Sequence, residues 1–146
     1  MKRIDVVPLR GFDHLVFGTD RGRVRSLLGD YSEFRKSEFS QNTTDDFGFC
    51  HIYYDEENAF EAVEFFDDVD VFLDGEKIFP LPLREMMERI PSLAEDEDGA
   101  ISVPLSIGVY VESETVACIT FAKAGYFDYL NDDDMPSRGN IDPAAL

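Results

Sequence analysis

Two histidines and two cysteines, His14, His51, Cys50 and Cys118, are the side chains best suited to covalent catalysis. A nucleophile needs a base beside it, usually a histidine. Cys50 and His51 are neighbours in the sequence, but consecutive residues of a strand point to opposite faces of the sheet. We therefore expect both cysteines to be buried structural thiols, with His14 as a minor alternative for a catalytic base. The sequence predicts no catalytic residue.

The acidic residues could instead hold a metal ion. The run Glu95–Gly99 does not match a calcium loop at the first or the last ligand position. Asp67, Asp68 and Asp70, together with Glu64, could form a two-metal carboxylate site. Acids that follow a strand more often form a solvated loop. We therefore expect no metal and no cofactor, and the sequence contains no glycine-rich phosphate loop.

Charge is the strongest signal in the sequence. Thirty-one acids and 13 bases give a formal net charge of −18, and residues 41–146 hold most of the excess. Such a surface repels nucleic acids and anionic membranes and favours basic partners; the alternative is acidity that serves solubility alone. One basic cluster is expected to be an internal counter-charge or a second protein-contact surface: Arg21, Arg23, Arg25, Arg35 and Lys36.

Length and composition indicate one folded domain. The chain has 146 residues, of which 44% are hydrophobic. No apolar run approaches the roughly 18 residues that a membrane span needs. Met1–Arg10 lacks the apolar stretch of a secretory signal, and two cysteines form no disulfide framework. We expect a cytoplasmic protein with its domain over residues 1–130, followed by an acidic, flexible tail over residues 131–146.

Helix signals and hairpin signals alternate along the chain. Thr19 or Asp20 can cap a helix that stops at Gly29, and a second helix is expected between Pro82 and Pro91. Ser40–Asp46 is interpreted as a loop. Three hairpins are predicted: Cys50–Tyr54 with Phe60–Phe66, Val69–Leu73 with Lys77–Phe79 around Asp74–Gly75, and Ser106–Val111 with Thr115–Ala122. The predicted fold class is α+β, an antiparallel β-sheet with two helices packed on one face.

Two hairpin segments resemble each other. Aligning Ile52–Phe66 with Val109–Ala122 brings Tyr53 onto Tyr110. Each segment lies downstream of one predicted helix. This pattern favours a tandem helix-plus-meander repeat with halves at residues 12–80 and 81–130.

The stretch Phe12–Phe34 resembles the helix opening of the BamE and β-lactamase-inhibitor-protein class. In that class a glycine-threonine pair starts a helix that ends in Leu-Gly, and strands follow. Here Gly18-Thr19, Val24 and Leu28-Gly29 occupy these places. The resemblance implies a binding scaffold, in some members a tandem repeat, with no catalytic residues. The chain lacks the cysteines of those inhibitors and the lipoprotein signal of BamE. In general character it also resembles small acidic bacterial immunity proteins.

The sequence predicts a non-enzymatic acidic protein-binding or inhibitor protein, most concretely an immunity protein that neutralises a basic toxin such as a nuclease. The alternatives are a metal-dependent hydrolase that uses scattered carboxylates and a structural module that self-assembles through a sheet edge. The tyrosines among the contact residues named next could also simply pack within the sheet. The expected steering acids and tyrosine anchors are Asp67, Asp68, Asp70, Glu95, Asp96, Asp98, Tyr53, Tyr54 and Tyr110.

Overall fold

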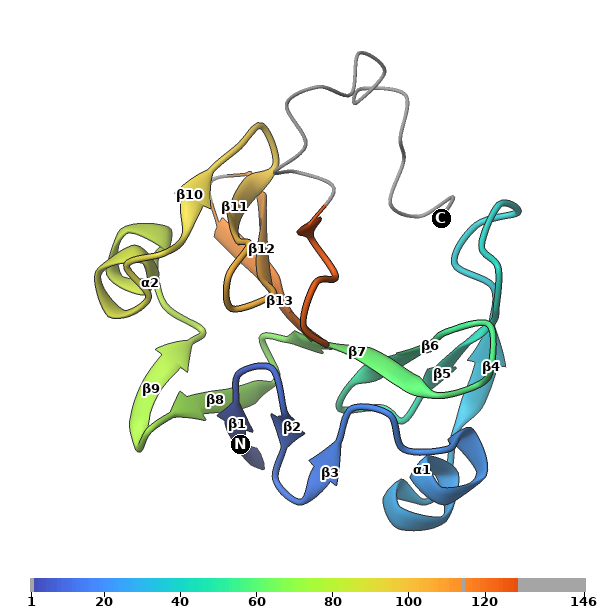
Figure 1. Cartoon of the computed structure of the whole chain (residues 1–146). Helices are drawn as coiled ribbons and strands as arrows, with labels where there is room; N and C mark the ends of the chain where they lie inside the picture. Colours follow the sequence, from blue (N-terminus) through green and yellow to red (C-terminus); the bar gives the residue numbers. More distant parts are fainter. Residues whose placement is uncertain (1, 114, 129–146) are drawn as a thin grey trace.

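Strands dominate the fold. The computed structural model describes residues 2–113 and 115–128, so the predicted tail at residues 131–146 lies outside the described residues. Within these ranges thirteen strands form two sheets, accompanied by two short helices, α1 (Arg21–Leu28) and α2 (Leu83–Arg89) (Figure 1). The prediction of an α+β fold with both helices packed on one face of a single sheet is therefore wrong.

The larger sheet has eight strands, and every neighbouring pair is antiparallel. It consists of two four-stranded meanders, joined where their last strands pair with Ile119 opposite Phe65. Each meander follows one of the helices in the chain. In sheet order the strands are β10 (Ala94–Glu95), β11 (Gly99–Ser102), β12 (Ile107–Glu112), β13 (Thr115–Ala122), β7 (Phe60–Phe66), β6 (His51–Tyr54), β5 (Thr44–Asp46) and β4 (Ser32–Phe34).

The smaller sheet has five strands and includes one parallel pair. β1 runs parallel to β8, with Ile4 opposite Val71. The other neighbouring strands of this sheet pair antiparallel. In sheet order the strands are β3 (Leu15–Val16), β2 (Gly11–Phe12), β1 (Lys2–Val7), β8 (Val69–Leu73) and β9 (Glu76–Phe79). Figure 1 shows this sheet along the lower side of the molecule, below β7 and β13.

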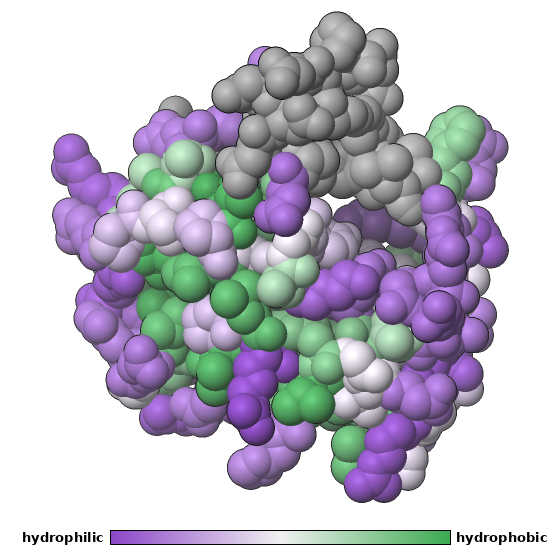
Figure 2. Space-filling view, viewed as in Figure 1, coloured by the Kyte–Doolittle hydropathy of each residue, from purple (hydrophilic) through white to green (hydrophobic). Residues whose placement is uncertain are grey.

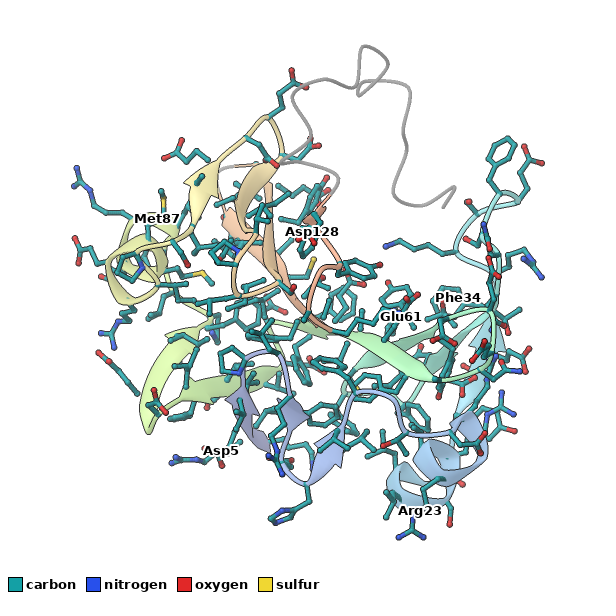
Figure 3. The ribbon with its side chains drawn as sticks, in the orientation of Figure 1. Asp5, Arg23, Phe34, Glu61, Met87 and Asp128 are labelled. Atoms are coloured by element: carbon teal, nitrogen blue, oxygen red, sulfur yellow. The ribbon has the colours of Figure 1, made fainter. Side chains whose placement is uncertain are left out.

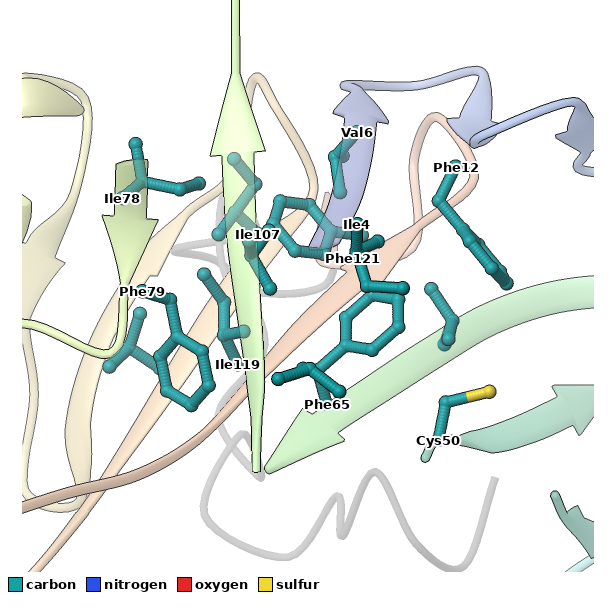
Figure 4. Close-up of a cluster of buried hydrophobic side chains, with 14 of the residues drawn as sticks. Ile4, Val6, Phe12, Cys50, Phe65, Ile78, Phe79, Ile107, Ile119 and Phe121 are labelled. Atoms are coloured by element: carbon teal, nitrogen blue, oxygen red, sulfur yellow. The ribbon is translucent and has the colours of Figure 1, made fainter. Parts of the chain in front are cut away.

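One hydrophobic core joins the two sheets. Phe65 of β7 is fully buried, and its ring meets Phe12 of the smaller sheet edge to face at a centroid distance of 5.2 Å. Phe121 of β13 lies on its other side, at 6.2 Å. Ile4 enters the same cluster from β1 (Figure 4). Burial of these side chains is the main stabilising contribution to the contact between the sheets.

The helices are too short to cover a sheet. α1 has eight residues and buries only Arg21 and Val24, while α2 has seven and buries only Met86. Figure 1 shows them at opposite ends of the molecule. The face that helices were expected to cover is therefore covered by the second sheet. Neither helix in the described part of the chain is long and apolar enough to cross a membrane.

The local elements were predicted more accurately than the overall architecture. The three predicted hairpins form, and Asp20 caps α1 by accepting a hydrogen bond from the backbone N–H of Gly22 at 3.0 Å. Gly29 ends that helix at φ 90°, a conformation that favours glycine. The prediction of a loop over Ser40–Asp46 is wrong at its end, where Thr44–Asp46 forms β5.

Hydrophilic and hydrophobic residues are distributed unevenly over the surface. Figure 2 shows hydrophilic residues along the outer parts of the molecule, including the side formed by β4 and α1. Hydrophobic residues gather nearer the centre of this view, around β1 and β8. A hollow on the face of the eight-stranded sheet that points away from the core is described next.

Candidate functional site

An open cavity of about 1000 Å³ lies over the face of the eight-stranded sheet that points away from the core. Its described lining includes residues of β5, β6, β7, β12 and β13 and of the loops beside them. Figure 3 shows Glu61 rising from β7 between Phe34 on one side and Asp128 on the other. The described lining residues include one lysine, Lys36, and six carboxylates: Asp55, Glu56, Glu57, Glu61, Glu64 and Asp98. Two of these carboxylates, Asp55 and Glu61, also lie 3.8 and 3.4 Å from Lys123 Nζ.

A β-bulge brings two of these carboxylates to the same face. Regular alternation would place Glu61 and Glu64 on opposite sides of β7. The pairing of β6 with β7 shifts, however, so that Tyr53 lies opposite Ala62 and Tyr54 opposite Phe60. Glu61 is the additional residue of this bulge, and both glutamates line the cavity.

Glu64 is the centre of the cavity floor. Its side chain is only 14% exposed. The Tyr53 hydroxyl donates to Glu64 Oε1 at 2.8 Å, and the Cys118 thiol donates to Oε2 at 3.3 Å. His51 Nδ1 lies 3.7 Å from the same carboxylate, and Lys36 Nζ donates to the Tyr53 hydroxyl at 3.2 Å. The floor is therefore a partly buried anion held mostly by neutral donors.

The cavity rim is held by its own turns. Asp55 accepts hydrogen bonds from the backbone N–H groups of Glu57 and Ala59, at 2.9 and 3.0 Å. Across the cavity, Asp96 accepts hydrogen bonds from the backbone N–H groups of Asp98 and Gly99, at 2.9 and 2.8 Å. Such turns fix the backbone while leaving neighbouring side chains exposed. The exposed Glu57 and Asp98 therefore project from ordered loops.

A buried ionic network supports one wall of the cavity from below. Asp45 is fully buried and accepts hydrogen bonds from Arg21 at 2.9 Å and from Arg25 at 2.8 Å. Arg21 also donates to Asn42 and Asn58, at 3.0 and 3.2 Å. These two asparagines belong to the loops beside the cavity. The expectation that this arginine cluster includes an internal counter-charge is confirmed for Arg21 and Arg25.

The buried Asp45 and the partly buried Glu64 are both stabilised as anions. Burial by itself would raise the pKa of Asp45, but hydrogen bonds from Arg25, Arg21 and Tyr54 lower it from 3.8 to about 2. Burial likewise opposes ionisation of Glu64, and the interaction with His51, 3.7 Å away, and the charge of Lys36 lead the effects that bring its pKa from 4.5 down to about 2. Both groups therefore carry a negative charge across the physiological range.

Acid should remove the contribution of Glu64 to stability. Because the folded pKa lies below the unfolded one, this contribution is complete above about pH 4.5 and is lost as pH falls toward about pH 2, and it amounts to about 3 kcal/mol. We expect wild type and Glu64→Gln to differ in urea midpoint at neutral pH and to converge through this window. A difference that stays constant with pH would contradict the assignment.

Four of the predicted contact residues line the cavity, Tyr53, Tyr54, Asp98 and Tyr110. Tyr110 is 44% exposed at the rim, and Tyr53 is half-buried on the floor. The predicted role of Tyr54 as a contact anchor does not fit the structure. Tyr54 is only 4% exposed and its hydroxyl donates to Asp45 at 2.9 Å, so it cannot act as a surface anchor. Glu95 is exposed on β10 beside this site. The carboxylate of the neighbouring Asp96 holds its own turn.

The other predicted acids lie elsewhere. Asp67 and Asp68 form the exposed turn that leads from β7 into the smaller sheet, and Asp67 lines a separate cavity of about 410 Å³. Asp70 lies on β8 and pairs with Lys77 at 3.2 Å. The sheet register pairs Tyr110 with Cys118 and Cys118 with Phe66, so this turn begins two strands away from Tyr110. Asp67, Asp68 and Asp70 are nevertheless not among the described residues that line the cavity with Tyr53 and Tyr110.

The thiols and the floor tyrosine are held in their protonated forms. Burial raises the pKa of Cys118 to about 12, with the Glu64 charge acting in the same direction. Burial and the Glu64 charge also raise the pKa of Tyr53, and burial raises that of Cys50. Cys50 is in the core and His51 lines the opposite face, as predicted. Cys118 is buried as expected, but it faces the cavity.

Sequence reasoning missed Glu61 and considered Glu64 only as a possible metal ligand, because the bulge that places both glutamates on one face leaves no clear mark in the sequence. The adjacent acids Asp55, Glu56 and Glu57 lie between the two strands of the first predicted hairpin and were not among the predicted site residues. Within residues 2–113 and 115–128, no group of three or more His, Cys, Asp or Glu side chains is arranged to hold a metal ion.

In comparisons with family models, curated proteins and solved structures, nothing matches this chain.

Proposed function

We propose that this chain is a non-enzymatic acidic protein that binds a basic protein partner through the cavity over β6, β7 and β13. The observation that carries the proposal is the gathering of carboxylates from separate segments around one cavity, with Tyr53 and Tyr110 among the residues that line it. In its most concrete form the protein is an immunity protein that neutralises a basic toxin such as a nuclease. The proposal places it in the cytoplasm, where thiols stay reduced.

Electrostatics supports an attractive role for this face. A hollow lined by charges of one sign focuses the field and speeds the encounter with a partner of opposite sign. Glu57 and Asp98 lie on opposite sides of the cavity and are exposed, so they act on an approaching partner at long range. Tyr110 offers a large contact surface at the same rim.

The chemistry of the floor supports binding over catalysis. An effective nucleophile needs a lowered pKa or a base that removes its proton. At this cavity burial and the Glu64 charge raise the pKa values of Cys118 and Tyr53. Both groups donate hydrogen bonds to Glu64, which holds their protons in place.

Capture from source-cell lysate tests the proposal. The bait is wild type, the rim variant Glu57→Lys/Asp98→Lys, or a control, Glu85→Lys/Glu88→Lys, which makes the same charge change on exposed positions of α2. We expect wild type and the control to capture the same basic protein at about 0.05 M salt and to lose most of it at about 0.5 M. The rim variant should capture at least about tenfold less. Equal capture by the rim variant and the control would contradict the proposal.

A further inference from the structure

We propose that the cavity floor at Tyr53 and Glu64 is a pocket for one arginine side chain of the partner, and that Lys36 of this chain occupies it in the free protein. This inference rests on the proposed function and names the group that the cavity recognises. It concerns only the floor, whereas the proposed function rests on the charged rim.

The first step is the state of the floor. Glu64 is 14% exposed and receives hydrogen bonds from Tyr53 and Cys118, which carry no positive charge. A partly buried carboxylate is costly unless a cation compensates it. His51 Nδ1 lies 3.7 Å away, and the charge of Lys36 acts on the same carboxylate. A cation that takes the place of Lys36 therefore meets a carboxylate that is already ionised.

The second step is the lysine already present. Lys36 lies on the loop between β4 and β5, and its Nζ is 4.8 Å from the Tyr53 ring centroid and 3.2 Å from its hydroxyl oxygen. This is the geometry of a cation–π contact. Lys36 is itself exposed. A cation from a partner can therefore replace it without leaving Glu64 uncompensated.

The third step is the preference for arginine. A guanidinium is planar, stacks on aromatic rings and presents five donors that match a carboxylate. The pocket supplies the Tyr53 ring and the Glu64 carboxylate together, and Glu61 lies one bulge away on the same face. Lysine offers a compact, strongly hydrated charge that makes fewer of these contacts. We therefore expect arginine to bind more tightly than lysine.

The test uses short peptides in place of the unidentified partner. The probes are acetyl-Gly-Arg-Gly-amide, its lysine analogue and its citrulline analogue, which keeps the shape of arginine without the charge. Binding to the full chain is followed by NMR titration, with shifts expected at Tyr53 and Cys118. We expect the arginine peptide to bind at least about tenfold more tightly than the citrulline peptide. Equal binding of the two would overturn the inference.

Lys36→Ala supplies the decisive comparison. Because this variant removes the internal occupant, it should bind the arginine peptide about two- to fivefold more tightly. Arg23→Ala removes one positive charge from α1, where Figure 3 shows the side chain pointing away from the sheet, and it should change the affinity by less than about 1.5-fold. Unchanged or weaker binding by Lys36→Ala, or an equal gain in both variants, would overturn the inference.

Failure here is distinguishable from failure of the proposed function. If the peptides fail to discriminate but capture of the basic partner still depends on Glu57 and Asp98, the floor pocket is wrong and the acidic binding face stands. If the peptides bind as expected but capture does not depend on the rim, the pocket stands and the proposed function is wrong.

Discussion

Replacing Asp45 by alanine is expected to lower the free energy of unfolding by about 3–5 kcal/mol. Asp45 is fully buried at the edge of the core, under α1. Its carboxylate receives hydrogen bonds from Arg21, Arg25 and Tyr54, each between 2.8 and 2.9 Å.

The cost arises mainly from what the substitution leaves behind. The side chain of Arg21 is 10% exposed, and after the change its nearest carboxylate is Glu33 at 3.9 Å. An arginine left with hydrogen bonds to Asn42, Asn58 and Thr43 and with the Tyr54 ring at 4.3 Å is a poorly compensated buried charge. Since these partners border the cavity, its wall should loosen with the network.

Urea unfolding of Asp45→Ala measures this effect, with Asp68→Ala as the control. Asp68 is exposed in a turn, and its removal makes the same change in net charge. We expect the control to lie within about 0.5 kcal/mol of wild type. A loss of less than about 1 kcal/mol in Asp45→Ala would show that the network contributes little to stability.

The second large effect is expected for Phe65→Ala, which should cost about 3–5 kcal/mol. Phe65 has no exposed surface, and its ring lies between Phe12 of the smaller sheet and Phe121 of the larger one. Truncation removes both aromatic contacts and leaves a cavity where the two sheets meet. The substitution therefore weakens the contact between the two sheets, and the free energy of unfolding falls for that reason.

Thermal and urea unfolding of Phe65→Ala are compared with those of Phe39→Ala. Phe39 is 64% exposed, so the same chemical change there should alter stability by less than about 0.5 kcal/mol. Similar losses in the two variants would contradict the placement of Phe65 at the centre of the core.

Local structure could be predicted from the sequence wherever its cause is local. Asp74 and Gly75 adopt φ values of 52° and 81°, which the Asp-Gly pair favours, and the β8–β9 hairpin forms as predicted. The parallel pairing of β1 with β8 depends on contacts between residues more than sixty positions apart. No turn motif specifies such a pair, so the second sheet was missed and helices were assigned to its place.

The candidate site, like the fold, contains residues that could be predicted from the sequence and residues that could not. Tyr110 and Asp98 were predicted as contact residues because their types suit an interface, and both line the cavity. Asp67 and Asp68 were chosen for their charge alone, which says nothing of their distance from the tyrosines. Glu61 was missed because a single bulged residue reverses its direction.

The central claim is that the acidic face of the cavity receives a basic partner, and the association rate constant tests it most directly. It is measured by stopped flow for the captured partner with wild type and with Glu57→Lys/Asp98→Lys, over about 0.05 to 0.5 M salt. The account predicts a wild-type rate that falls steeply with salt and a variant that is slower at low salt, with a flatter dependence. A wild-type rate independent of salt, or identical curves for the two proteins, would contradict it.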